Sequence, residues 1–430
     1  MKETITVIDS VMGTGKTHYI INHINTMPLD QKVIVVTPYM EECRRFNQSV
    51  TTRNLTIFDE ESEGYNKKDG TKMKRFREAI FNDENIVVTH SLFLAADTDL
   101  IESIDNGSYT LILDEVLDVV EPVPKEPGDV RRLLDTKMIR VGENRKLHWM
   151  ATGYAGKDDV KVRDAIETGN CYLYENALVL QQYPAEFFRA FDKTFILTYM
   201  WDSARLRVYC KANDLQCEIM AVENGERLVP YDRQREDRKA IFDLMTIHTG
   251  KRKYNHNTAK AYSGDWLRRL DSQGIQRLTE DLKNFFEKVA KAKGGEVYWS
   301  TLKEVGEKMK SRRVKVKDKN GDFVKYASGK IKTRQIGTGY NMAELHWNVR
   351  ATNDWDDRRA IAYLYNRIPR NDERQYFSEN GEKLNYEQLA VSDFLQWAFR
   401  SRIRKGEPID VYLPSSRMRA ALIKWVNHEI

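Results

Sequence analysis

A glycine-rich segment near the start of the chain, residues 10–17 (SVMGTGKT), constrains the fold more than any other feature. It follows an apolar run with strand character at residues 5–8 and precedes a helical pattern at residues 18–25. Glycines let such a loop fold tightly around phosphate oxygens, and the helix N-terminus adds the positive end of its dipole. The pattern [AS]-x-x-G-x-G-K-T, with Ser10 where the strict form has Gly, therefore predicts a phosphate-binding loop rather than a Gly-rich turn that binds nothing.

The residues of this loop have separate expected roles. We expect the backbone of Gly13, Thr14 and Gly15 to surround the phosphates of a bound nucleotide. Lys16 then reaches the β- and γ-phosphates, and Thr17 holds Mg²⁺.

Composition limits the remaining function classes. The chain has 430 residues, long enough for two or three domains. Its net charge of +5 comes from 69 basic and 64 acidic residues, so any contact with nucleic acid has to use local patches. The 4 cysteines show no C-x-x-C spacing, which fits a reducing cytoplasm and argues against a zinc site. No apolar run of about 18 residues is present, so we expect a cytoplasmic protein without a membrane partner.

Short apolar runs recur along the first half of the chain, each without an obvious polar face. They lie at residues 5–8, 33–36, 86–88, 111–113 and 195–197. This pattern is typical of parallel strands covered by helices on both sides, and it predicts a doubly wound α/β domain over residues 1–225. We expect a helical insertion at about residues 120–192 within it. Residues 226–292 are expected to form a linker and a helical segment, and residues 293–430 a second α/β domain.

Two carboxylates, Asp114 and Glu115, directly follow the apolar run at residues 111–113. At the carboxyl end of a parallel strand, Asp114 is expected to bind Mg²⁺ through water, and Glu115 to polarise the attacking water. The alternative is a solvated strand end. The order of loop and carboxylates along the chain favours the catalytic interpretation.

Polar residues at other strand ends are candidate nucleic-acid contacts. Thr37, Thr89 and His90 follow two of the predicted strands, on the edge where ligand-binding loops gather. Helix capping explains these residues nearly as well. Arg350 and Asn353 are candidate contacts from the second domain.

Three polar side chains recur every four residues near the end of the chain: Gln396, Arg400 and Arg404. The spacing predicts that they share one face of a helix over residues 392–404, with Arg402 elsewhere. Cations stacked in this way suggest an anion opposite them, and an arginine that reaches a γ-phosphate fits. A solvated basic helix is the alternative.

Residues 311–334 carry nine Lys or Arg against two Asp. Alternation over residues 313–317, an Asn-Gly turn at 320–321 and a returning run at 323–326 predict a basic β-hairpin. Lys315, Lys317 and Phe323 would contact nucleic acid, with Phe323 or Tyr326 stacking on bases. A solubilising surface hairpin is equally consistent with this pattern.

Taken together, these motifs resemble those of superfamily 2 helicases. The SVMGTGKT loop is similar to motif I, LILDEV to motif II, and QWAFRSRIR to motif VI; LTYMW and RATNDW resemble DEAD/DEAH-box-like helicases of phages and prophages. A looser similarity connects MGTGKT and LILDEV to viral origin-binding helicases. The resemblance implies two RecA-like domains, ATP bound between them, and a nucleic-acid strand crossing both. Motif VI reads Q-x3-R-x3-R here, so both Arg400 and Arg404 are candidates for the arginine finger, the arginine that reaches the γ-phosphate.

The function expected from these observations is an ATP- and Mg²⁺-dependent helicase in phage or prophage replication. Its expected partners are single-stranded or tailed duplex DNA, with RNA as an alternative, and replication proteins. A DNA- or origin-binding ATPase that remodels DNA or loads partners is the second hypothesis. A nucleotide-gated interaction protein is a third, and intact Lys16, Thr17, Asp114 and Glu115 argue against it.

Overall fold

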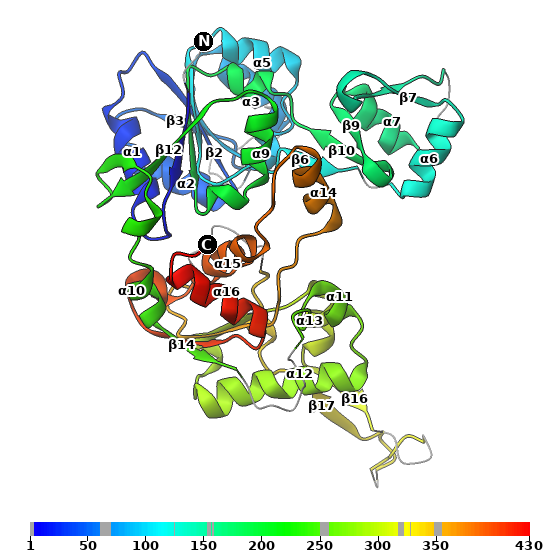
Figure 1. The fold of residues 1–430 in the computed structure, drawn as a ribbon. Helices are drawn as coiled ribbons and strands as arrows, with labels where there is room; N and C mark the ends of the chain where they lie inside the picture. The colour runs from blue at the N-terminus through cyan, green and yellow to red at the C-terminus, as the bar shows by residue number, and fades with distance from the viewer. Residues whose placement is uncertain are drawn as a thin grey trace. The chain divides into compact units, whose positions relative to one another are not determined.

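The structure is a computed structural model. It describes residues 4–60, 70–123, 125–152, 156, 159–249, 258–316, 322–326, 328–347 and 355–430. The chain forms two compact units (Figure 1). The first comprises Met1–Asp232 and Pro369–Asn385, and the second comprises Arg233–Ile368 and Tyr386–Ile430.

An eight-stranded sheet forms the centre of the first unit, in the order β13-β12-β1-β11-β5-β2-β4-β3. Neighbouring strands run parallel, except that β13 pairs antiparallel with β12. The strands are β1 Ile5–Asp9, β2 Lys32–Thr37, β3 Leu55–Ile57, β4 Asn85–Thr89, β5 Tyr109–Leu113, β11 Lys193–Thr198, β12 Cys217–Glu223 and β13 Arg227–Pro230. The five strands predicted from apolar runs are all present; β3, β12 and β13 are additional.

Helices cover both faces of this sheet, which explains the apolar runs. On one face Ile8, Val35 and Ile112 pack with Ile20 and Phe46 from two of the helices. The alternate strand residues, which point to the other face, are equally buried. The helices are α1 Lys16–Thr26, α2 Met40–Ser49, α3 Lys72–Phe81, α4 His90–Phe93, α5 Thr98–Asp105, α8 Glu186–Arg189 and α9 Arg205–Ala212.

The insertion after β5 is not helical throughout, and the prediction was wrong in this respect. Helices α6 Pro127–Asp135 and α7 Val160–Glu167 fit the expectation, but the described part of the insertion also contains five strands. These are β6 Val120–Pro122, β7 Ile139–Val141, β8 Leu147–Trp149, β9 Cys171–Tyr174 and β10 Leu178–Gln182. Most are three or four residues long, too short for alternation to distinguish a strand from a loop. A separate apolar core, which includes Val130, Leu147 and Val179, holds the insertion together.

The division of the chain also differs from the expected boundaries. Strand β13, at residues 227–230, still belongs to the first sheet, so the predicted linker is wrong, whereas helices α11 (Gly264–Arg268) and α12 (Ser272–Asn284) form the predicted helical segment. Helix α14 (Asn371–Glu379) belongs to the first unit, although it lies within the predicted second domain. Ion pairs account for this placement: Glu379 pairs with Arg145 at 2.6 Å, and Glu382 pairs with Arg207 at 2.6 Å.

The second unit contains a four-stranded parallel sheet in the order β14-β19-β18-β15. All residues of β15 and β18 are buried, so both faces of the sheet are covered. The strands are β14 Met245–His248, β15 Val297–Ser300, β18 Ala360–Tyr363 and β19 Ile409–Tyr412. The helices are α10 Arg238–Asp243, α11 Gly264–Arg268, α12 Ser272–Asn284, α13 Lys303–Met309, α15 Tyr386–Ala398 and α16 Ser416–Val426. The predicted fold class, two α/β domains of the RecA-like type, is confirmed.

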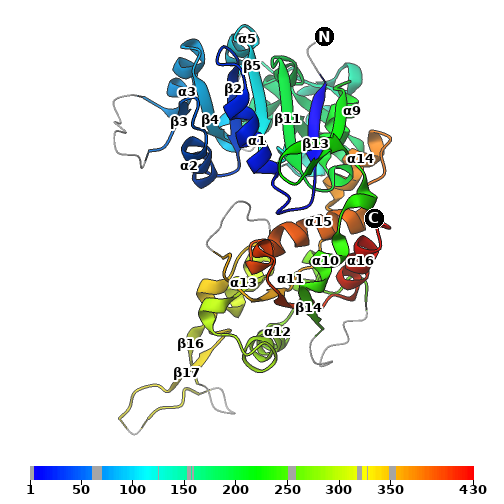
Figure 2. The ribbon, with the colours of Figure 1, turned by 90° about the vertical axis from the view of Figure 1, so that its left-hand side faces the viewer.

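The described residues of 312–336 in the second unit form a basic ribbon, whose strands pair differently from the predicted β-hairpin. Strand β16 (Arg312–Lys315) pairs antiparallel with β17 (Thr333–Ile336), not with residues 323–326. Residues 323–326 do return toward the end of the first run, as predicted, because the Val324 N–H donates to the Val316 carbonyl at 3.0 Å, and Lys325 also bridges to Ile331. The ribbon extends away from the four-stranded sheet (Figure 1, Figure 2), and the predicted Asn-Gly turn lies outside the described residues. Among the described residues, no helix is long and apolar enough to cross a membrane.

Candidate nucleotide-binding site

The loop between β1 and α1 has the backbone that the glycines predict. Gly13 has φ 84° and Gly15 has φ 90°, both in the left-handed region that favours glycine. A side chain on Gly15 would place its Cβ 2.8 Å from the Cα of Gly225, in the turn between β12 and β13. Gly15 caps α1 without any side-chain hydrogen bond to the helix. The first N–H groups of α1 therefore lack a side-chain cap, which fits the binding of phosphate oxygens.

Two residues at the start of the loop hold it against neighbouring strands. The Ser10 hydroxyl accepts a hydrogen bond from the Val222 N–H at 2.9 Å, which gives this serine a structural role on β12. The buried Asp9 carboxylate accepts N–H bonds from Met200 at 2.8 Å and Trp201 at 2.9 Å. These bonds stabilise a left-handed turn at Met200 and fix the end of β11 beside the loop.

The Lys16 ammonium lies over the same loop. It donates to the carbonyl oxygens of Ser10 and Val11, the second at 3.1 Å. The Thr14 hydroxyl donates to the Val11 carbonyl at 2.8 Å and closes the loop across its base. Lys16 thus stays at the loop through backbone contacts, in reach of a bound phosphate.

Strand order brings the predicted acidic pair to this loop. Strand β11 lies between β1 and β5, with Asp9 opposite Thr198 and Ile196 opposite Leu113. The Thr17 hydroxyl donates to Asp114 Oδ1 at 3.0 Å, across 97 residues of sequence. Hydroxyl and carboxylate oxygens are the donors that Mg²⁺ prefers, so Thr17 and Asp114 fit a metal bound with nucleotide. Glu115 follows directly and is partly buried.

The pKa of the Asp114 carboxylate is raised. Burial raises the pKa of Asp114 to about 7, and the Arg45 guanidinium, 3.4 Å from Oδ2, opposes part of this rise. Arg45 also pairs with Glu42 at 2.6 Å. Arg45 and Glu42 are not predictable from the sequence, because nothing in their local pattern indicates that Arg45 contacts a residue 69 positions away.

The strand-end residues proposed as nucleic-acid contacts divide into two kinds. Thr37 and Thr89 lie side by side on β2 and β4, at the same sheet edge. Thr37 is buried, and its hydroxyl donates to the Tyr39 carbonyl at 3.0 Å, so it holds the turn before α2 and does not cap the helix. Thr89 and His90, at the start of α4, are partly exposed and stay candidates.

The predicted helical face of Gln396, Arg400 and Arg404 is wrong. Helix α15 ends at Ala398, and Ser401 is extended before a 3₁₀ helix (Arg402–Lys405) begins. The Ser401 hydroxyl accepts the Ile403 N–H and caps this second helix. Gln396 alone lies on α15, where it donates to Ser392 at 3.1 Å.

The remaining predicted contacts are on the ribbon or outside the described residues. The Lys315 ammonium lies 5.2 Å from the centroid of the Phe323 ring, a cation–π contact at the exposed surface. Lys317, Arg350 and Asn353 lie outside the described residues.

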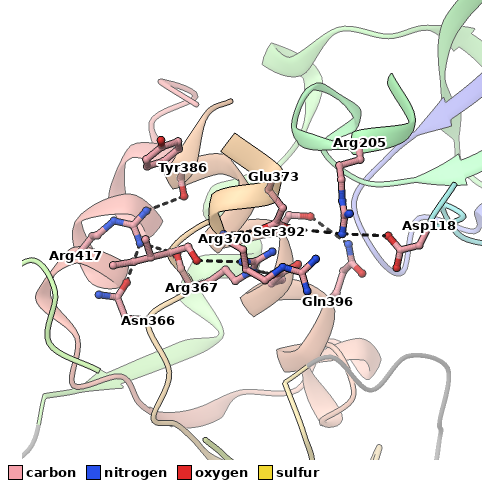
Figure 3. Close-up of polar contacts among 12 residues, drawn as sticks. Asp118, Arg205, Asn366, Arg367, Arg370, Glu373, Tyr386, Ser392, Gln396 and Arg417 are labelled. Carbon is pink, nitrogen blue, oxygen red and sulfur yellow. Dashed lines mark hydrogen bonds and ion pairs between the residues drawn. The ribbon is translucent and has the colours of Figure 1, made fainter. Parts of the chain in front are cut away.

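Figure 3 shows polar clusters that the sequence analysis did not identify. In the second unit, Arg417 donates to Asn366 Oδ1 and to the Tyr386 carbonyl, both at 2.8 Å. In the first unit, Arg205 lies 3.7 Å from Asp118 and 3.9 Å from Glu373. These contacts hold loops that follow β18 and β5, and no local sequence signal marks them.

Comparison with known proteins gives partial matches. Residues 239–426 match the model of the YonV C-terminal Rossmann-like domain, and residues 3–118 match the thymidine kinase family model. The chain is 28% identical over 442 residues to the SPbeta prophage-derived uncharacterized protein YonV of Bacillus subtilis (strain 168), covering 99% of this chain and 100% of that protein.

Two solved structures are also similar. S. tokodaii Xpd4 has a TM-score of 0.47 at 10% identity, over 99% of this chain and 94% of that one. The DUF1998 helicase MrfA, bound to DNA and AMPPNP, has a TM-score of 0.37 at 10% identity, over 99% of this chain and 48% of that one.

The buried charge of Asp114 predicts that Asp114→Asn stabilises the fold. The pKa is about 7 in the folded chain and about 3.9 when unfolded, so the ionised carboxylate destabilises the folded state increasingly from about pH 4 and fully above about pH 7. We expect a gain of roughly 1 to 3 kcal/mol in unfolding free energy at pH 8, and less than half of that at pH 5. Chemical denaturation at both pH values measures it. The exposed Asp30→Asn is the control, and an equal gain at both pH values would contradict the prediction.

Proposed function

We propose that this chain is an ATP-driven nucleic-acid motor, a DNA helicase that acts in prophage replication. The observation that carries the proposal is the hydrogen bond from Thr17 to Asp114, which joins the phosphate loop to the Asp-Glu pair. The thymidine kinase model spans the same two motifs, at residues 3–118, and supports a site for ATP. The prophage-derived relative supports the phage context.

Each residue of the site has a task in ATP hydrolysis. Lys16 and the N–H groups of Gly13, Thr14 and Gly15 bind and orient the phosphates. Thr17 and Asp114 hold Mg²⁺, which neutralises phosphate charge when bound. Glu115 accepts a hydrogen bond from the attacking water and aligns it with the γ-phosphate.

A phosphotransferase that acts on a nucleoside is the second candidate, because the thymidine kinase model matches the first unit. Turnover of labelled ATP, measured alone, with thymidine and with single-stranded DNA, separates the candidates. A motor releases phosphate faster when DNA is added and makes no thymidine monophosphate. Stimulation by DNA without unwinding of a tailed duplex would favour the remodelling ATPase instead.

We expect Lys16→Ala to abolish turnover, because the loop loses the cation that faces the γ-phosphate. Glu115→Gln should retain binding of Mg²⁺–ATP while hydrolysis slows by orders of magnitude, since the amide does not accept the proton of water. Filter binding and phosphate release measure the two effects. Near-normal hydrolysis by Lys16→Ala would refute the motor.

For the second unit, we propose that either Arg400 or Arg404 stabilises the charge that develops on the γ-phosphate. Alanine at the correct position should lower turnover by about 10³-fold or more, with much less effect on ATP affinity. Arg402→Ala is the matched control, because the Arg402 Nε donates to the Pro408 carbonyl at 2.7 Å. Similar, mild losses at all three positions would indicate a solvated basic segment.

The ribbon supports contact with a nucleic-acid strand. The described cations Arg313, Lys315 and Lys325 are exposed, and Phe323 and Tyr326 have 44% and 52% of their surface exposed. Exposed aromatic rings beside cations are typical of surfaces that stack on bases and pair with phosphates.

The register of the ribbon allows a clean truncation, because Lys315 lies opposite Thr333. Replacing residues 316–332 with Asn-Gly closes these strands with a two-residue turn. We expect basal ATP hydrolysis to persist, DNA affinity to fall, and its salt dependence to become shallower because fewer counterions are released. Unwinding should fall further than binding if Phe323 or Tyr326 separates strands. Unchanged salt slope and unwinding would leave the ribbon without this role.

A further inference from the structure

Helix α2 carries an ion-pair bridge to the predicted metal ligand. Glu42 and Arg45 are three positions apart on this helix, and their side chains meet at 2.6 Å between Oε2 and Nη2. The same Nη2 lies 3.4 Å from Asp114 Oδ2. One guanidinium therefore joins a helix of the first unit to the end of β5.

The Arg45 bridge compensates the charge of two buried carboxylates. The side chains of Glu42 and Asp114 are only 6% and 7% exposed. Two buried carboxylates that contact the same guanidinium repel each other, and a buried charge is costly unless it is paired. Arg45 balances both carboxylates, because one nitrogen of its guanidinium, Nη2, lies near each of them.

The two oxygens of Asp114 have different partners. Oδ1 accepts the Thr17 hydroxyl at 3.0 Å, while Oδ2 faces Arg45. A carboxylate held from both sides keeps one orientation before any ligand arrives. Partners that orient a metal ligand typically change metal affinity by 10- to 100-fold when they are removed.

We propose that Arg45 is a positioning residue of the nucleotide site. It fixes Asp114 so that Oδ1 stays beside the Thr17 hydroxyl, where the metal that accompanies the nucleotide binds. Glu42 anchors Arg45 in this position. The inference rests on the proposed ATP site and names a residue that the phosphate-loop motifs do not include.

The neighbouring arginine provides a matched control. Arg44 Nε pairs with Asp59 Oδ2 at 2.6 Å, away from Asp114. Arg44 and Arg45 belong to the same helix and are similarly exposed, at 37% and 30%. Variants at the two positions therefore remove equal charge from one helix, but only one removes the contact with Asp114.

The test measures metal binding directly on the full chain. Mn²⁺ serves as the probe, with a non-hydrolysable ATP analogue present, and free Mn²⁺ is followed by electron paramagnetic resonance. We expect Arg45→Gln to weaken Mn²⁺ binding by about 10- to 100-fold, and Arg44→Gln to leave it unchanged. Arg45→Lys should fall between, because it keeps the positive charge but loses the planar guanidinium that sets the direction of these contacts.

A second readout separates positioning from a general loss of structure. ATP turnover by Arg45→Gln should recover toward the normal value as the metal concentration rises, whereas a folding defect would not respond to metal. If Arg45→Gln does not fold, as judged by circular dichroism, the comparison of Arg45→Lys with Arg44→Lys decides. Equal Mn²⁺ affinity of the paired variants would overturn the inference. Failure of the unaltered chain to bind Mn²⁺ and analogue would instead overturn the proposed function, and this inference with it.

Discussion

The hydrogen bond between Thr17 and Asp114 is the contact on which the candidate site depends. It joins a helix start to a strand end 97 residues later in the chain. The contact requires β11 to lie between β1 and β5, and the Asp9 carboxylate fixes the end of that strand through two backbone N–H groups. A change in this strand order would separate phosphate loop and acidic pair, although each motif would remain intact in the sequence.

Two buried carboxylates of the first unit, Asp9 and Asp114, have different partners and affect stability differently. Asp9 is satisfied by backbone donors, so its charge stabilises the fold locally. Among the described residues, the Asp114 carboxylate contacts the Thr17 hydroxyl and, at 3.4 Å, the Arg45 guanidinium, and burial raises its pKa to about 7. A carboxylate in this state has much to gain from a divalent cation, because the cation supplies the charge that the protein provides only in part. The buried Asp114 carboxylate therefore lowers the stability of the folded chain, and a bound divalent cation would offset that cost.

The parallel strands were predictable because they are buried on both faces, so that runs such as residues 33–36 contain no polar residue. The phosphate loop and acidic pair were predictable from spacing. The hairpin β12–β13 was missed although Asn224-Gly225, both with positive φ, marks its turn between apolar runs. The helix over residues 392–404 was predicted too long, because the period of four continues past Ala398 while Ser401 starts a new cap. Arg45, Arg205 and Arg417 were unpredictable, since their partners are set by tertiary packing alone.

The return of residues 369–385 to the first unit has a mechanical consequence. The chain passes between the units at three places, after residues 232, 368 and 385. Ion pairs attach this segment to the rest of the first unit: Glu379 binds the insertion and Glu382 binds α9. The ring centroids of Tyr376 and Tyr174 also lie 5.9 Å apart. In the proposed motor, movement between the units would be taken up by backbone rotation at these three connections, because the segment belongs to the first unit. Residues next to them, rather than those of the phosphate loop, are therefore where hinge behaviour is to be sought.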